Sequence, residues 1–187
     1  MDILRAFPDA GWTAVKITQY GHNICAVSGD DCDCAPADHS FALDEEHECN
    51  DRTDSSRFLV AGAARAFWLR TQQEQLAEAL PALRAELAGA NNVIIESNTL
   101  LRFLVPDLYL VVLDPSQPDF KASARQFLDR ADAFVLRHPL ASPETSWPDV
   151  PASLFSCTPS FLQPLWHPLP PGLADLVRAR LWPRVRV

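Results

Sequence analysis

Short apolar runs alternate along this chain with stretches whose apolar residues recur at helical spacing. The runs are rich in β-branched and aromatic residues and are mostly continuous in apolar character. This pattern is typical of strands that are buried on both faces of a parallel sheet. The five runs are WTAVKITQ (12–19), AFWLR (66–70), NNVIIE (91–96), DLYLVVLD (107–114) and DAFVLR (132–137).

The segments between these runs carry helix signals. Residues 54–66 follow Thr53, a residue type that favours the N-cap position. Residues 71–89 open with Thr71 and Glu74, which have the spacing of a capping box. Both segments are therefore predicted to be helices.

Two further details complete the helix predictions. Pro81 lies inside the second helix and is expected to kink or divide it. Residues 120–131 carry apolar side chains on one stripe and predict a third, amphipathic helix. Strands that alternate with helices predict an α/β fold, with a parallel sheet flanked by helices in three layers.

The pattern changes after Arg137. Ten of the 16 prolines lie between Pro139 and Pro183, and few residues there are suited to a sheet. We expect residues 138–171 to be irregular and to pack through their aromatic residues, which are Trp147, Phe155, Phe161 and Trp166. A short helix is predicted over 172–181. The chain is therefore expected to consist of an α/β domain over 1–137 and a proline-rich extension over 138–187.

Composition and charge limit the class of protein, its compartment and its partners. The chain of 187 residues is 48% hydrophobic, which is ordinary for a globular domain, and it has no apolar run long enough to span a membrane. The N-terminus lacks a secretory signal, so we expect a cytoplasmic protein without a membrane partner. The net charge is −8, and residues 30–54 hold ten acidic residues against one basic residue. This acidity argues against a nucleic-acid partner.

Thiols and imidazoles gather in a predicted loop over 20–52. Zinc is held by four nitrogen or sulfur ligands, and ligands in close pairs are easier to gather. Two such pairs are present, formed by His22 with Cys25 and by Cys32 with Cys34. His39 and Cys49 are candidate substitutes. A zinc site, reduced thiols without metal and a disulfide all remain open as interpretations of this cluster.

A series of weaker motifs occurs in a recognisable order. GWTAVKITQYGH is followed by TDSSRFLVAGA, then by NVIIESN, which ends a strand in Glu96, and then by DLYLVVLDP. This order resembles the P-loop proteins of the molybdopterin-guanine dinucleotide biosynthesis MobB family. Asp54, Ser55 and Arg57 match the helix motif of that family, Glu96 matches its strand-end acid, and Lys16 and His22 match its first signature loosely. The resemblance covers residues 1–137.

The resemblance implies a P-loop NTPase-like, nucleotide-binding accessory protein in molybdenum cofactor or metallocentre assembly, with a protein partner in that assembly. Asp54, Arg57 and Glu96 would lie near magnesium and the phosphates of GTP or ATP. Whether the chain is an enzyme stays open, because no triad of catalytic residues is evident. A homodimer is also possible.

The phosphate-binding motif itself is absent. No G-x-x-x-x-G-K-[ST] sequence occurs, and neither of the two lysines, Lys16 and Lys121, follows a glycine. Residues 2–11 are expected to be the last turns of the helix that would follow such a loop. The first strand and the loop are therefore expected to be missing, and the chain as given is expected not to bind a nucleoside triphosphate tightly. Magnesium and nucleotide would be cofactors only where such a loop precedes residue 1. The alternative function is a metal-binding or protein-interaction module that uses the Cys/His loop.

Overall fold

The computed structural model describes residues 1–20, 40–117, 122–140, 147 and 150–182. The chain divides into two compact units, Met1–Leu100 and Leu101–Val187. This division differs from the boundary expected at residue 137. Each unit has a sheet and a hydrophobic core of its own.

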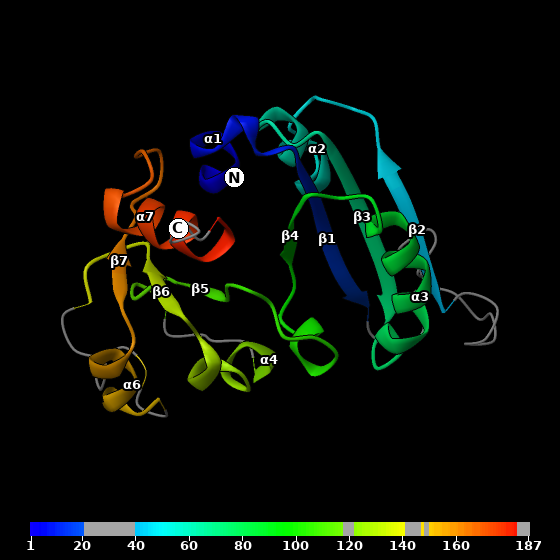
Figure 1. The fold of residues 1–187 in the computed structure, drawn as a ribbon. Helices are drawn as coiled ribbons and strands as arrows, with labels where there is room; N and C mark the ends of the chain where they lie inside the picture. Colours follow the sequence, from blue (N-terminus) through cyan, green and yellow to red (C-terminus); the bar gives the residue numbers. More distant parts are fainter. Residues whose placement is uncertain (21–39, 118–121, 141–146, 148–149, 183–187) are drawn as a thin grey trace, which may run out of the picture. The chain divides into compact units, whose positions relative to one another are not determined.

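The first unit contains a four-stranded sheet (Figure 1). Its strands are β1 (Trp12–Tyr20), β2 (Phe41–Glu46), β3 (Arg65–Gln72) and β4 (Asn92–Glu96), in the order β2-β3-β1-β4. β1 pairs in parallel with both β3 and β4, as the apolar runs predict. The helical elements are α1 (Asp2–Ala6), η1 (Pro8–Ala10), α2 (Asp54–Val60) and α3 (Leu76–Leu87), and η2 (Leu100–Arg102) spans the boundary between the units.

The sheet is mixed, which corrects the expectation of a purely parallel sheet. β2 pairs antiparallel with β3, and it lies within the segment expected to be an irregular loop. The strand alternates Phe41 and Leu43, which pack on the core, with more polar positions. Its strand signal is weak because three of its six residues are acidic. Arg65 offsets one of those charges by a two-pronged pairing with Glu45 at 2.8 and 2.9 Å.

One face of this sheet packs against α3. The core joins Val15 and Ile17 of β1 and Phe67 and Leu69 of β3 to Leu76, Ala79 and Leu83 of α3. Because successive strand residues point to opposite faces, Ala14, Lys16, Ala66 and Trp68 belong to the other face. α2 contacts β1 and β3. The sheet thus presents one apolar face and one face with polar positions.

The start of α3 differs from the prediction. β3 continues to Gln72, so Thr71 is a fully buried strand residue and does not cap a helix. Glu74 has a φ of 71° in the turn that follows, and the helix begins at Leu76. The capping-box spacing was misleading because tertiary burial of Thr71 extends the strand. α3 also runs through Pro81 as one helix.

The second unit contains a three-stranded parallel sheet. Its strands are β5 (Leu110–Leu113), β6 (Ala133–Leu136) and β7 (Ser160–Leu162), in that order. Its helical elements are α4 (Ala122–Arg125), η3 (Leu128–Arg130), α6 (Ala152–Cys157) and α7 (Pro171–Leu181). The predicted helix over 120–131 is therefore two short pieces, whereas the terminal helix is confirmed.

Two predictions about this region are wrong. β5 and β6 pair with each other and with β7, and in the described part of the chain they do not pair with β1 or β4. The proline-rich segment does supply a strand, because Ser160–Leu162 fits between Pro159 and Pro164. Three residues are too few to produce a readable alternation.

The aromatic residues of the proline-rich segment divide into two groups. Trp147 is 1% exposed and stacks on Phe155 with ring centroids 5.8 Å apart, so the predicted packing of these two rings is confirmed. Trp166 is instead 95% exposed, at a φ of 66°. It lies in a turn whose flanking Gln163 is buried and donates from Nε2 to the carbonyl oxygen of His167 at 2.6 Å.

Candidate functional site

A group of four charged side chains forms where β1, β4 and α2 meet, and we call it the Lys16 cluster. Lys16 lies opposite Glu96 in the parallel register of β1 and β4, and Glu96 is the last residue of β4. Asp54 is the first residue of α2. The Lys16 Nζ lies 2.6 Å from Glu96 Oε1 and 2.9 Å from Asp54 Oδ2. Arg57 completes the cluster, with its Nη1 3.3 Å from Asp54 Oδ1.

The three residues predicted to contact a nucleotide, Asp54, Arg57 and Glu96, therefore lie together. Asp54 and Arg57 come from α2, and Glu96 stands at the carboxyl end of β4, which pairs in parallel with β1. Ligands of open α/β sheets bind at that edge. The residue that joins Asp54 to Glu96 is Lys16, which fits the motif of the resemblance only loosely. Its signal was a lone lysine inside the apolar run WTAVKITQ.

Electrostatic interactions shift the pKa values of Lys16 and Asp54 toward their ionised forms. Burial acts to lower the pKa of Lys16, but hydrogen bonds and charge interactions with Glu96 and Asp54 outweigh it, so the pKa is raised. The hydrogen bond from Lys16 lowers the pKa of Asp54 against the effect of burial, and the charges of Lys16 and Arg57 act in the same direction. At neutral pH the cluster thus holds an ammonium ion between anionic oxygens.

The segment before α2 fixes the position of Asp54. Thr53 is the N-cap of α2 and accepts a hydrogen bond from the Ser56 backbone N–H at 3.1 Å. The Ser56 hydroxyl accepts in return from the Thr53 N–H at 3.0 Å. Glu46 at the end of β2 accepts from the Ser55 hydroxyl at 2.7 Å and the Thr53 hydroxyl at 3.1 Å. These bonds tie the start of α2 to the sheet.

The same face of the sheet carries a second polar group. The Trp68 indole N–H donates to Thr18 Oγ1 at 3.0 Å, and the Arg70 guanidinium lies 4.5 Å from the Trp68 ring centroid. Arg70 also pairs with Asp44. Trp68 belongs to the apolar run AFWLR, which suggests a core position. The structure instead places it, partly buried, on the face that contains Lys16.

The donor set only partly suits magnesium. Asp54 and Glu96 offer carboxylate oxygens, the ligands that magnesium prefers. The Lys16 ammonium, however, lies within hydrogen-bond distance of an oxygen from each. A magnesium ion between these two oxygens does not fit while Lys16 stays in place.

The predicted zinc ligands His22, Cys25, Cys32 and Cys34 lie outside the described residues, as does His39. The zinc prediction therefore stays a prediction. Cys49 is described and is exposed. In the described ranges, no three His, Cys, Asp or Glu side chains are grouped in a way that would hold a metal ion.

The second unit contains two further polar features. His138 has a polar partner in the structure, because its Nδ1 lies 2.8 Å from Asp114 Oδ1. Asp114 follows β5 and also accepts from the Ser116 hydroxyl at 2.7 Å. Hydrogen bonds from Ser116 and His138 lower the pKa of Asp114.

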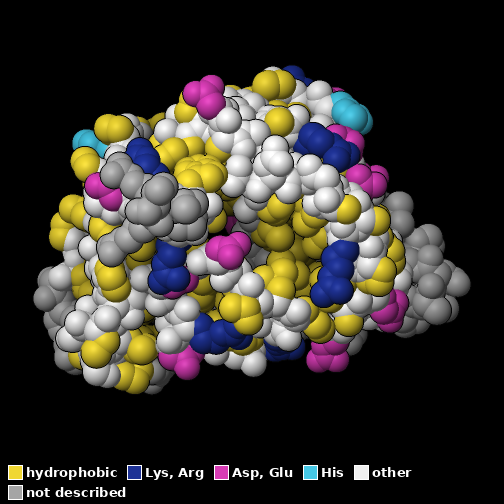
Figure 2. Space-filling view, in the orientation of Figure 1, with side chains coloured by type: hydrophobic (Ala, Val, Ile, Leu, Met, Phe, Trp, Pro, Cys, Tyr) yellow, Lys and Arg dark blue, Asp and Glu magenta, His cyan; other side chains and the backbone are white. Residues whose placement is uncertain are grey.

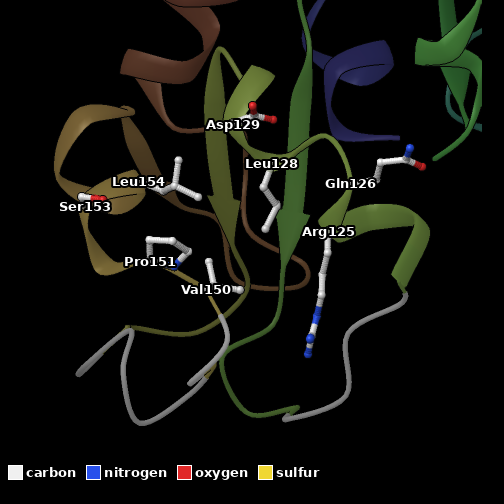
Figure 3. Close-up of a pocket in the computed structure, with 8 residues that line it drawn as sticks. All are labelled: Arg125, Gln126, Leu128, Asp129, Val150, Pro151, Ser153 and Leu154. Carbon is white, nitrogen blue, oxygen red and sulfur yellow. The ribbon is translucent and has the colours of Figure 1, made fainter.

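The second feature is an open pocket of about 390 Å³ in the same unit. Leu128, Val150 and Leu154 form its apolar part, and Arg125 extends away from them (Figure 3). No residue of the Lys16 cluster lines this pocket.

Figure 2 shows acidic and basic side chains interspersed on the visible face, without a large patch of one sign.

Comparison with protein families, curated proteins and solved structures gave no match to this chain. Within the described residues, no helix combines the length and the apolar character that a membrane span requires.

Proposed function

We propose that this chain is a nucleotide-binding accessory protein of the P-loop NTPase-like class, acting in molybdenum cofactor or metallocentre assembly. One observation carries the proposal. Asp54 and Glu96, which the resemblance assigns to nucleotide binding together with Arg57, are 42 positions apart in sequence and yet both contact Lys16 on one face of the sheet, and Arg57 contacts Asp54.

The charges of the cluster are compatible with a phosphate-bearing ligand. Lys16 and Arg57 are the cations that phosphate oxygens would contact. Of these, the Lys16 side chain is 20% exposed and the Arg57 side chain is 54% exposed. Arg57 is therefore the more accessible of the two, and a substitution of Arg57 is the more direct test of the proposal.

Binding by these 187 residues is expected to be weak, because the backbone cradle of a phosphate loop is absent from the sequence. We expect dissociation constants well above the micromolar range, about 1 mM in order of magnitude. An accessory role is favoured for the same reason, since catalysis of phosphoryl transfer depends on tight positioning of the phosphates.

The test is a titration of the isotope-labelled protein with GTP and with ATP, followed by NMR. Nucleotide should shift the amide signals of Lys16, Asp54 and Glu96 before those of the second unit. Arg57→Ala should weaken the response several-fold. Arg84→Ala, a change at an exposed position of α3, should leave it unchanged.

Two results would contradict the proposal. One is the absence of any shift in the cluster with either nucleotide at millimolar concentration. The other is an equal loss of response in the Arg57 and Arg84 variants, which would indicate nonspecific attraction of the anion.

A further inference from the structure

The Lys16 ammonium occupies the position that a metal ion would need in order to bridge Asp54 and Glu96. Its Nζ lies 2.9 Å from Asp54 Oδ2 and 2.6 Å from Glu96 Oε1. Divalent cations bind carboxylate oxygens at about 2.0 to 2.6 Å, depending on the ion. The ammonium and a bridging metal would therefore compete for the same two oxygens.

Burial favours the ammonium in this competition. The Lys16 side chain is 20% exposed and approaches from the sheet, whereas Asp54 and Glu96 are 47% and 58% exposed. The cation is part of β1, so it is held beside the carboxylates at a high effective concentration. A metal ion from solution would have to displace a charge that the fold itself keeps in place.

The net charge of the Lys16 cluster also disfavours the binding of a metal ion. Asp54 and Glu96 carry two negative charges, and Lys16 and Arg57 carry two positive charges. Both Lys16 and Asp54 have pKa values shifted toward the ionised form. The cluster is thus neutral in sum, and it offers a divalent cation little net attraction.

From these contacts we infer that the Lys16 ammonium occupies the space between Asp54 and Glu96 and excludes a divalent metal ion from this pair of carboxylates. This inference goes beyond the proposed function, because it concerns the cluster whether or not a nucleotide binds. It also implies that any anionic ligand that binds here does so without a bridging metal. Chelating agents should leave such binding unchanged.

The test measures Mn²⁺ binding by the electron paramagnetic resonance signal of the free ion. Lys16→Met keeps the length of the side chain and removes its charge, so it should raise Mn²⁺ affinity at least about tenfold over wild type. Lys16→Arg keeps a cation and should not raise it. Adding Asp54→Asn or Glu96→Gln to Lys16→Met should abolish the gain.

The other acidic residues of the chain provide a constant background, because they are unchanged in every variant. Far-UV circular dichroism checks that each variant is folded. A second measurement uses only the wild-type protein. Mg²⁺ is diamagnetic and acts only on nearby signals, so it should leave the side-chain carboxylate signals of Asp54 and Glu96 unshifted, whatever it does in the acidic segment over 40–52.

Three outcomes would overturn the inference. These are a Mg²⁺-induced shift of the Asp54 and Glu96 carboxylate signals in wild type, a folded Lys16→Met variant without a gain, and a gain that survives Asp54→Asn. None of them depends on nucleotide. If nucleotide titration fails while Lys16→Met gains Mn²⁺ affinity, the proposed function is wrong and the exclusion of metal stands.

Discussion

Individual side chains of similar type have very different environments in this protein. Trp147 is 1% exposed, belongs to the core of the second unit and donates from its indole N–H to the Gln117 carbonyl oxygen at 3.2 Å. Trp166, 19 positions later, is 95% exposed. Sequence reasoning treated both as packing residues, because a lone tryptophan among prolines carries no sign of its burial.

This contrast gives a matched prediction. Trp147→Ala should lower the free energy of unfolding by about 3 to 5 kcal/mol, because it removes a large buried ring and leaves a cavity. Trp166→Ala should change it by less than about 0.5 kcal/mol, since the ring contacts mainly water. Urea unfolding followed by circular dichroism measures both. Equal effects in the two variants would contradict the burial described for these rings.

The site residues show what sequence can and cannot reveal at this scale. Asp54, Arg57 and Glu96 are predicted as candidate site residues from the order of the motifs, which records residue type and succession. Lys16 was not assigned its central position, because the contact depends on the register between β1 and β4. Pairing between strands that are 80 positions apart is set by tertiary packing, and a single sequence does not display it.

At the scale of elements, long apolar strands and a capped helix were the predictable parts. β1, β3 and β4 lie within a few residues of the predicted runs, and α2 begins after Thr53 as its capping signal indicates. β2 and β7 were missed for different reasons. Charged residues mask the alternation of β2, and β7 is only three residues long.

The cap of α2 can be tested directly. Thr53→Ala removes the oxygen that accepts from the Ser56 N–H, and it should lower the free energy of unfolding by about 1 kcal/mol. Thr53→Ser keeps that oxygen and should retain most of the stability. Faster hydrogen exchange at Ser56 in the alanine variant would locate the effect. Equal stability of the two variants would show that the cap contributes nothing measurable.

At the scale of the whole molecule, the chain forms two units with separate sheets, whereas its pattern predicted one. The alternation of strands and helices continues across residue 100 without a break, so the pattern gives no sign of where one sheet ends. The choice of partner for β5 is a matter of long-range pairing. The α/β class was therefore predictable, and the division into sheets was not.

The predicted zinc ligands His22, Cys25, Cys32 and Cys34 lie in sequence between β1 and β2, and the zinc site stays a prediction. Purified protein should carry about one equivalent of zinc, and Cys32→Ser with Cys34→Ser should remove it while the amide spectrum of β1, β3 and β4 persists. Cys157→Ser, at an exposed position in α6, should retain the metal. Affinity should fall as the pH is lowered, because the ligand thiols must lose protons to bind.

Two results would contradict the zinc prediction. If the wild-type protein carries less than about one-tenth of an equivalent of transition metal and takes up none on addition, the loop is an acidic, thiol-bearing surface. Retention of zinc in the double serine variant would instead assign the ligands to other residues.

The exposure of Trp166 makes it a natural optical reporter for the second unit. An indole surrounded by water fluoresces at longer wavelength than one enclosed by apolar side chains, and it is reached first by a dissolved quencher. Trp12 and Trp147 are both at most 2% exposed, so they should contribute the shorter-wavelength, protected part of the emission. Any molecule that covers the turn over 163–167 should therefore shift the red edge of the spectrum and shield it from quenching, without a dye or a label on the protein.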